Sequence, residues 1–251
     1  MKEYIGEESS SDCHSGLHKI GKFLGCYMCD AHQQAILNNS AKMKTFPLSQ
    51  CSVVPTLVNI TFCGNQITEL PAAFFHTFTH LSNLNLEGNL LRSLPQGIGK
   101  LTKLKHLNLS NNKLTHLPGD FNGCRHTLLK LDLASNYLTS LPSSIGEFKK
   151  LIRLDLNNNL ITSLPESIYQ LRSLITLKLA GHQLHELPST FGQLSQLKVL
   201  DLSGLPILTD INETSVLHKD NMRATLARKE GNQPINGYDN DVSIFSSSSN
   251  Q

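Results

Sequence analysis

The sequence is poor in aromatic side chains and lacks the features that mark a secreted or membrane-spanning protein. Aromatic residues make up 6% of the 251 residues, and tryptophan is absent. Aliphatic side chains must therefore supply most of any core. No apolar run is long enough to cross a bilayer, and the acidic, serine-containing first residues do not resemble a signal peptide. We expect a cytoplasmic protein without a transmembrane segment.

Strong charge of one sign is also missing. The formal net charge is +2, and the lysines and arginines are scattered along the sequence without a basic block. This pattern does not favour nucleic acid as a partner. The six cysteines, in a chain without an export signal, are expected to be reduced thiols.

Motifs that carry catalysis are absent as well. The sequence contains no GxxxxGK[ST], no GxSxG, no HExxH and no paired zinc-deaminase motif. We therefore predict that the protein is not an enzyme, and that it has no catalytic residues, no cofactor and no resident metal.

What the sequence does contain is a repeat. The form LxxLxLxxN occurs four times in the middle of the chain, and more divergent copies lie on both sides of it. The first leucines of the seven copies are Leu57, Leu81, Leu104, Leu128, Leu151, Leu174 and Leu197. Successive copies are 24, 23, 24, 23, 23 and 23 residues apart, which is within the range of leucine-rich repeats.

Each column of the repeat has a physical role. The second and third leucines alternate with polar residues, which predicts a short strand with one buried face. A Leu-Pro pair follows in every complete copy, and proline suits the start of a short helix. An asparagine amide both donates and accepts, so it can pair with buried backbone groups between coils. This predicts a structural ladder formed by Asn65, Asn89, Asn112, Asn136 and Asn159.

The pattern LxxLxLxxNxLxxLPxxIxxLxx resembles the typical intracellular leucine-rich-repeat class. Ras-suppressor-type proteins and the repeat domains of Scribble- and Erbin-like scaffolds belong to this class. The resemblance implies an α/β solenoid with a parallel sheet on its concave side and short convex helices or 3-10 turns. It also implies a protein-binding adaptor in intracellular signalling, with a small GTPase or a phosphatase as partner. A helical bundle is the alternative, but bundles do not place a proline after a leucine in every copy.

The sequence divides into an N-terminal segment, a repeat domain and a C-terminal segment, with boundaries at 1–33, 34–211 and 212–251. Apolar residues at helical spacing predict an amphipathic helix over residues 15–32 that caps the first coil. A degenerate first copy would precede the seven others by 24 residues if it begins near Gln33. A short helix over residues 214–229 and a disordered tail are expected at the C-terminus. We expect a monomer.

The polar strand positions on the concave side are the candidate partner-binding surface. They face away from the leucines and repeat on neighbouring strands, so they form a continuous ridge. The candidates are Asn83, Asn85, Glu87, His106, Asn108, Lys130, Asp132, Arg153, Asp155, Asn157 and Lys178. Arg153 is the strongest single candidate, because its planar guanidinium can hold a carboxylate in two bonds. The alternative is a solvated surface on which these charges pair with one another.

Two further groups of residues remain as candidates. Apolar residues directly after the ladder asparagines would lie at the rim of the concave face and could anchor a partner. They are Leu90, Tyr137 and Leu160. Near the N-terminus, Cys26 and Cys29 form a CxxC with Cys13, His14, His18 and His32 close in sequence. This spacing is not a standard zinc framework, and cysteines often pack as small apolar residues. A metal- or redox-responsive regulator remains the alternative function.

Overall fold

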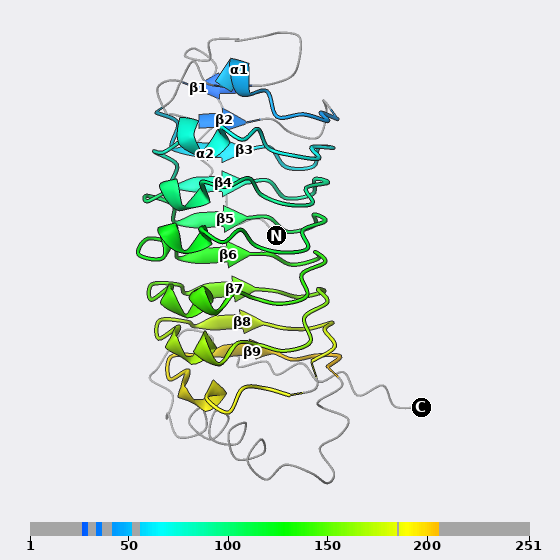
Figure 1. Cartoon of the computed structure of the whole chain (residues 1–251), viewed down its shortest axis with the longest axis vertical. Helices are drawn as coiled ribbons and strands as arrows, with labels where there is room; N and C mark the ends of the chain where they lie inside the picture. Colours follow the sequence, from blue (N-terminus) through cyan, green and yellow to red (C-terminus); the bar gives the residue numbers. More distant parts are fainter. Residues whose placement is uncertain (1–26, 30–33, 37–41, 52–55, 185, 206–251) are drawn as a thin grey trace, which may run out of the picture.

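The computed structural model describes residues 27–29, 34–36, 42–51, 56–184 and 186–205, which form one elongated stack of coils (Figure 1). Nine strands make a single sheet and follow one another in chain order. The first two strands pair antiparallel, and all later neighbours pair parallel. The expected C-terminal helix and tail lie outside the described residues.

Every strand has three residues, and short helices connect most of them. The strands are β1 (Tyr27–Cys29), β2 (Gln34–Ile36), β3 (Asn59–Thr61), β4 (Asn83–Asn85), β5 (His106–Asn108), β6 (Lys130–Asp132), β7 (Arg153–Asp155), β8 (Thr176–Lys178) and β9 (Val199–Asp201). The α-helices are α1 (Leu48–Cys51) and α2 (Phe74–Thr77). The 3-10 helices are η2 (Ile98–Lys100), η3 (Phe121–Cys124), η4 (Ser143–Glu147), η5 (Glu166–Gln170) and η6 (Phe191–Gln193).

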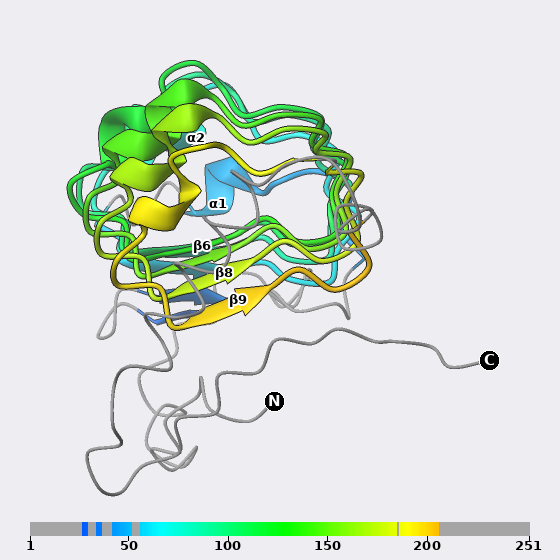
Figure 2. The ribbon, with the colours of Figure 1, turned by 90° about the horizontal axis from the view of Figure 1, so that it is seen from below.

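The leucine columns form the core between the sheet and the helices. Viewed along the stack, the strands lie on one side and the short helices on the other (Figure 2). From β3 to β9 the central residue of each strand is buried between two partly exposed neighbours, except in β7, where the last residue is also buried. The register places these central residues in one row, as Leu84 faces Leu107 and Leu107 faces Leu131. The structure thus confirms the predicted leucine-rich-repeat solenoid with its parallel sheet.

The N-terminal end of the stack differs from the sequence prediction. Residues 27–29 form strand β1 and not the end of a helix over residues 15–32, whose other residues lie outside the described ones. The first parallel strand would otherwise leave a row of unpaired backbone groups at the sheet edge. Strand β1 pairs with that edge, and this requirement outweighs the helical spacing of the apolar side chains.

The strand of the first copy is also shifted by one residue from the predicted register. A start near Gln33 would align Ile36 with Ile60, whereas the structure aligns Ala35 with Ile60 and Ile36 with Thr61. The step to the next copy is therefore 25 residues at the strand. Farther along the coil it is the predicted 24, because Met43 donates to the Asn65 side chain just as Ile67, 24 residues later, donates to that of Asn89.

Aromatic side chains gather where the first described coils meet. Phe46 packs edge-on against Phe62 and Phe74, with 4.7 Å between ring centroids in both pairs. Phe74 also contacts Phe75 and Phe78. Five phenylalanines, Phe46, Phe62, Phe74, Phe75 and Phe78, therefore fill this part of the core, whereas Phe121, Phe148 and Phe191 are buried in later coils.

Candidate protein-interaction face

The outward-pointing strand residues form two parallel columns across the sheet, which we call the sheet face. The first column contains Asn59, Asn83, His106, Lys130, Arg153, Thr176 and Val199, and the second contains Thr61, Asn85, Asn108, Asp132, Asp155, Lys178 and Asp201. Members of a column are direct neighbours on adjacent strands, about 5 Å apart. The sheet face is therefore continuous from β3 to β9, and it brings most of the predicted partner-binding residues together.

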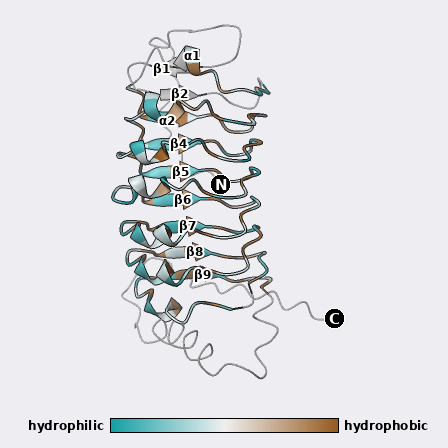
Figure 3. Cartoon of the chain, in the orientation of Figure 1, coloured by the Kyte–Doolittle hydropathy of each residue, from teal (hydrophilic) through white to brown (hydrophobic). Residues whose placement is uncertain are grey.

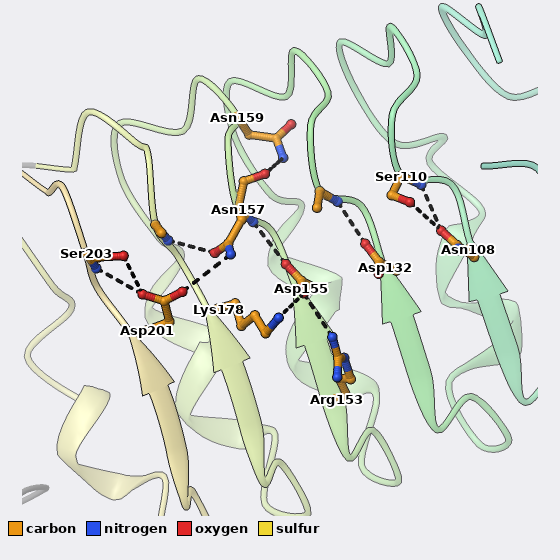
Figure 4. Close-up of polar contacts among 12 residues, drawn as sticks. Asn108, Ser110, Asp132, Arg153, Asp155, Asn157, Asn159, Lys178, Asp201 and Ser203 are labelled. Carbon is orange, nitrogen blue, oxygen red and sulfur yellow. Dashed lines mark hydrogen bonds and ion pairs between the residues drawn. The ribbon is translucent and has the colours of Figure 1, made fainter. Parts of the chain in front are cut away.

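Most residues of the second column have a structural task that the sequence analysis did not identify. The side-chain oxygen of Asn85 accepts a hydrogen bond from the backbone N–H two residues later, at 3.0 Å. The same Asx turn occurs at Asn108, Asp132, Asp155 and Asp201 (Figure 4). It fixes the chain as it leaves each strand. The signal in the sequence was the run of Asn and Asp at this position, since both residues favour this turn.

The middle of the sheet face holds a three-residue ion cluster. Asp155 accepts a hydrogen bond from Arg153 at 3.2 Å and lies 3.1 Å from the Lys178 amine (Figure 4). The Asp155 side chain is only 6% exposed, whereas those of Arg153 and Lys178 are 43% and 31% exposed. Asp155 was predicted to face the solvent, and this was wrong. Its neighbours cover it, so it holds two cations in place while they present donors outward.

A second polar group lies beside this cluster and is mainly acidic. The Asn108 amide donates to a Glu87 carboxylate oxygen at 3.0 Å. Burial raises the pKa of Asp132, and the negative charges of Asp155 and Glu87 act in the same direction, while the Ala134 N–H and Arg153 oppose them. At the start of β5, burial and the positive charge of the preceding Lys105 lower the pKa of His106. On β6 and β7, the cations Lys130 and Arg153 of the first column thus lie beside the carboxylates Asp132 and Asp155 of the second.

The predicted partner-binding residues outside the two columns also lie on this surface. Glu87 and Asn157 lie two residues after the ends of β4 and β7. The Asn157 amide accepts from the Ala180 N–H at 2.8 Å and donates to Asp201 at 3.4 Å (Figure 4). Asn157 thus joins the loop after β7 to the loop after β8 and to the last residue of β9.

The five ladder asparagines are buried and bonded to backbone in adjacent coils. Asn112 accepts from the Leu91 N–H at 3.1 Å and donates to the Leu86 and Leu109 carbonyls at 2.9 and 3.0 Å. Asn89, Asn136 and Asn159 repeat this pattern one coil apart, and Asn65 bonds to the backbone of residues 43, 62 and 63. Each amide therefore joins two or three backbone segments.

In the next copy a histidine occupies the ladder position. His182 is buried, and neither ring nitrogen has a hydrogen bond of normal geometry. Burial lowers the pKa of His182, although the backbone of Leu156 and Asn159 acts in the opposite direction. The ladder thus ends in a neutral ring that cannot reproduce the amide bonds.

The three rim candidates differ in exposure. Tyr137 and Leu160 are the large hydrophobic residues that the described part of the chain exposes, at 50% and 46%. Leu90 is only partly exposed. Tyr137 and Leu160 come from adjacent coils and lie at equivalent positions directly after a ladder asparagine.

The N-terminal cysteines and histidines lie almost entirely outside the described residues. Of them, only Cys29 is placed, on strand β1. Burial raises the pKa of the Cys124 thiol to about 12, and burial also raises the pKa of Cys63. Neither thiol is activated as a nucleophile. Among the described residues, no group of three or more His, Cys, Asp or Glu side chains is arranged to hold a metal, and no helix is long and apolar enough to span a membrane.

Comparisons with known proteins agree with this geometry. The leucine rich repeat family model matches residues 55–114, 79–129 and 126–184. No curated protein matches the chain. Among solved structures, a leucine-rich-repeat protein of Leptospira interrogans matches with a TM-score of 0.58 and 29% identity, over 68% of this chain and 50% of that one.

Two receptor structures are also similar. The ectodomain of the Arabidopsis thaliana receptor kinase GASSHO1/SCHENGEN3, in complex with Casparian strip integrity factor 2, has a TM-score of 0.59 and 33% identity, over 64% of this chain and 20% of that one. A TDR receptor has a TM-score of 0.61 and 26% identity, over 68% of this chain and 30% of that one. The chain spans half or less of the length of each of these three structures.

Proposed function

Because the chain belongs to the leucine-rich-repeat family, we propose that it is an adaptor that binds a partner protein on its sheet face. Leucine-rich-repeat domains are generally protein-interaction modules and typically not enzymes. Membership of the family does not indicate whether a partner binds on the sheet face, at the rim or on the helical side. The arrangement of charge on the sheet face supports the choice.

The observation that carries the proposal is the ion cluster around Asp155. The buried carboxylate holds Arg153 and Lys178 on neighbouring strands, so their side chains are already ordered before a partner arrives. Ordering two long side chains in advance lowers the entropic cost of binding. Both cations remain partly exposed and can still donate to a carboxylate on the partner.

The neighbouring strand offers the opposite charge. Asp132 uses one oxygen for its Asx turn, which leaves the second oxygen available to a cationic group. A partner segment that crosses β6, β7 and β8 would therefore meet Asp132, Arg153 and Lys178 in turn. Such a segment should carry both an acidic and a basic residue. Tyr137 and Leu160, on the loops after β6 and β7, would contact an apolar residue beside it.

The compartment, the oligomeric state and the class of partner are proposed from the resemblance to Ras-suppressor-type and Scribble-like proteins. On that basis the protein acts in the cytoplasm as a monomer, in signalling that involves a small GTPase or a phosphatase. The alternative of a metal- or redox-responsive regulator depends on residues of the N-terminal segment. No described residue supports that alternative.

The test compares the proteins captured by the wild type and by a sheet-face variant. The variant combines Lys130→Glu with Arg153→Gln, because a glutamate at position 153 would place a second negative charge beside the buried Asp155. Lys178 remains as the partner of Asp155, so the variant should fold. We expect it to lose at least one partner that the wild type captures, which quantitative mass spectrometry after affinity purification would detect.

A matched control makes the result specific. Lys103→Glu combined with Arg172→Gln changes the net charge by the same amount on exposed turns that precede β5 and β8, away from the rim residues and the ion cluster. This control should retain the partner, and thermal unfolding should show all three proteins folded. Retention of every wild-type partner by a folded sheet-face variant would exclude the sheet face as the binding surface.

A further inference from the structure

The turns that lead into β5 to β9 carry only positive charge. They comprise residues 102–105, 125–129, 149–152, 172–175 and 195–198, and contain no aspartate or glutamate. We call their cationic residues the basic edge: Lys103, Lys105, Arg125, Lys149, Lys150, Arg172 and Lys198. The same residues look scattered in the sequence, because the repeat separates them by whole coils.

The fold stacks these turns directly on one another. The backbone N–H of Leu129 donates to the Lys105 carbonyl at 2.8 Å, and that of Ile152 donates to Leu129 at 2.8 Å. Two more such bonds, from Ile175 and Lys198, extend the ladder at the same length. With about 5 Å between coils, the cations form a row about 20 Å long. In Figure 3 these turns lie along the side of the stack where the strands begin.

Only part of this charge is used within the protein. Arg125 lies 3.5 Å from Glu147, and the Lys149 amine donates to the Gly146 carbonyl at 2.7 Å and to Gln170. Lys103, Lys105, Lys150 and Arg172 are exposed, and their side chains have no hydrogen bond or ion pair with other described residues. Four unpaired cations therefore point into solvent from one edge of the molecule.

We propose that the basic edge docks the protein on an anionic phospholipid surface. Clusters of four to eight lysines and arginines are attracted to such surfaces. Most cations of the basic edge are lysines. A lysine amine is a point charge on a flexible side chain, whereas an arginine guanidinium binds a phosphate in a fixed bidentate geometry. The five turns also contain no Phe, Tyr or Trp on which a nucleic-acid base could stack. These features favour a diffuse anionic surface over a nucleic acid or a specific peptide.

This docking would leave the sheet face available. The basic edge precedes the strands, whereas the Asx turns and the ion cluster lie on the strands and at their ends. Membrane contact and partner binding would then use separate surfaces. The proposal is therefore independent of the proposed adaptor function, and either can fail alone.

The test is sedimentation of the full chain with lipid vesicles. Vesicles of phosphatidylcholine alone are compared with vesicles containing 30 mol% (roughly one lipid in three) phosphatidylserine. We expect binding only to the anionic vesicles, and weaker binding as the salt concentration rises. Lys150→Glu with Arg172→Glu should weaken this binding at least about tenfold. Arg92→Glu with Lys113→Glu, on the opposite edge, changes the net charge equally and should weaken it by less than about threefold.

Three outcomes would overturn the proposal. The first is that the wild type does not bind the anionic vesicles. The second is that both double variants lose binding equally, because net charge alone would then explain the attraction. The third is that the wild type ignores the vesicles but binds polyglutamate or single-stranded DNA through Lys150 and Arg172, which would assign the edge to a polymeric anion.

Discussion

Each ladder asparagine does more for stability than a surface hydrogen bond does, because its partners are buried. Asn112 accepts one backbone N–H and donates to the carbonyls of Leu86, Leu109 and Ser110. An apolar side chain of similar size would fill the space but leave these backbone groups without a partner. A buried unsatisfied group is more costly than the loss of an ordinary hydrogen bond.

We therefore predict that Asn112→Leu lowers the free energy of unfolding by about 1–3 kcal/mol. Lys113→Leu is the control, since it adds the same side chain at the exposed neighbouring position and should change stability by less than about 0.5 kcal/mol. Urea unfolding followed by circular dichroism measures both values. Equal midpoints for the two variants would contradict the structural role of the ladder.

His182 makes the last part of the stack sensitive to acid. Burial lowers its pKa, so below a pH of about 6.5 the unfolded chain binds a proton that the folded chain excludes. The contribution of His182 to stability is thus constant above that pH and falls as the pH drops below it. His106, whose pKa is also lowered, acts in the same direction.

His182→Asn should reduce this acid sensitivity and restore a ladder amide. We expect the melting temperature of the variant to exceed that of the wild type at pH 7.5, and the difference to grow at pH 5.5. Melting curves followed by circular dichroism between these two values provide the measurement. A difference that stays constant or shrinks toward pH 5.5 would show that folding does not lower the pKa of His182.

Between elements, glycines set how closely the short helices stack. A Cβ on Gly123 would lie only 2.2 Å from the Gly99 Cα, so η2 and η3 pack backbone against backbone. Gly146 is similar, since its Cβ would lie 2.4 Å from the Ser167 carbonyl. Backbone atoms cannot move aside as a flexible side chain can, and added volume in a packed region is destabilising.

Gly123→Ala should therefore destabilise the protein by about 1–3 kcal/mol. Gly119→Ala is a matched control, because a Cβ there would meet nothing within 4 Å. The two variants have the same composition and lie four residues apart in the sequence. Chemical unfolding should separate them clearly, and similar midpoints would argue against the tight contact between η2 and η3.

The sequence predicts the coils well because the repeat supplies several copies of each column. Where one copy departs from the pattern, as at Phe62 in place of a leucine, the other copies still identify the buried column. A further column of the repeat precedes the ladder: from β3 onward, the residue before each ladder position has a positive φ. It is glycine at 64, 88, 181 and 204, and asparagine or serine at 111, 135 and 158. Glycine and asparagine tolerate the left-handed backbone that the turn requires, and Ser135 adopts it as well.

The N-terminal end and the burial of Asp155 could not be predicted in the same way. Strand β1 forms because the first parallel strand needs a partner at its edge, and a one-residue shift in that copy breaks the periodicity that predicted the others. Asp155 occupies a position that is partly exposed in the other copies, from β3 to β9. It is buried because Arg153 and Lys178 fold over it, and that depends on three side chains from two strands.

At the scale of the whole molecule, the stack needs a closed end next to β2. Strand β1 pairs antiparallel with β2 and covers the edge of the sheet. Removal of residues 1–33 would delete β1 and leave the β2 edge open, whereas removal of residues 1–26 would keep it. An open sheet edge can pair with another chain, so we expect the shorter protein to aggregate or to melt at a lower temperature.

Light scattering and thermal unfolding of both truncated proteins test this prediction. The protein that begins at residue 27 should stay closer to the full chain in melting temperature and in mass. If it aggregates as readily as the protein that begins at residue 34, the edge depends on residues before β1 and not on β1. If neither protein aggregates and both melt like the full chain, the stack does not need a paired strand at this end.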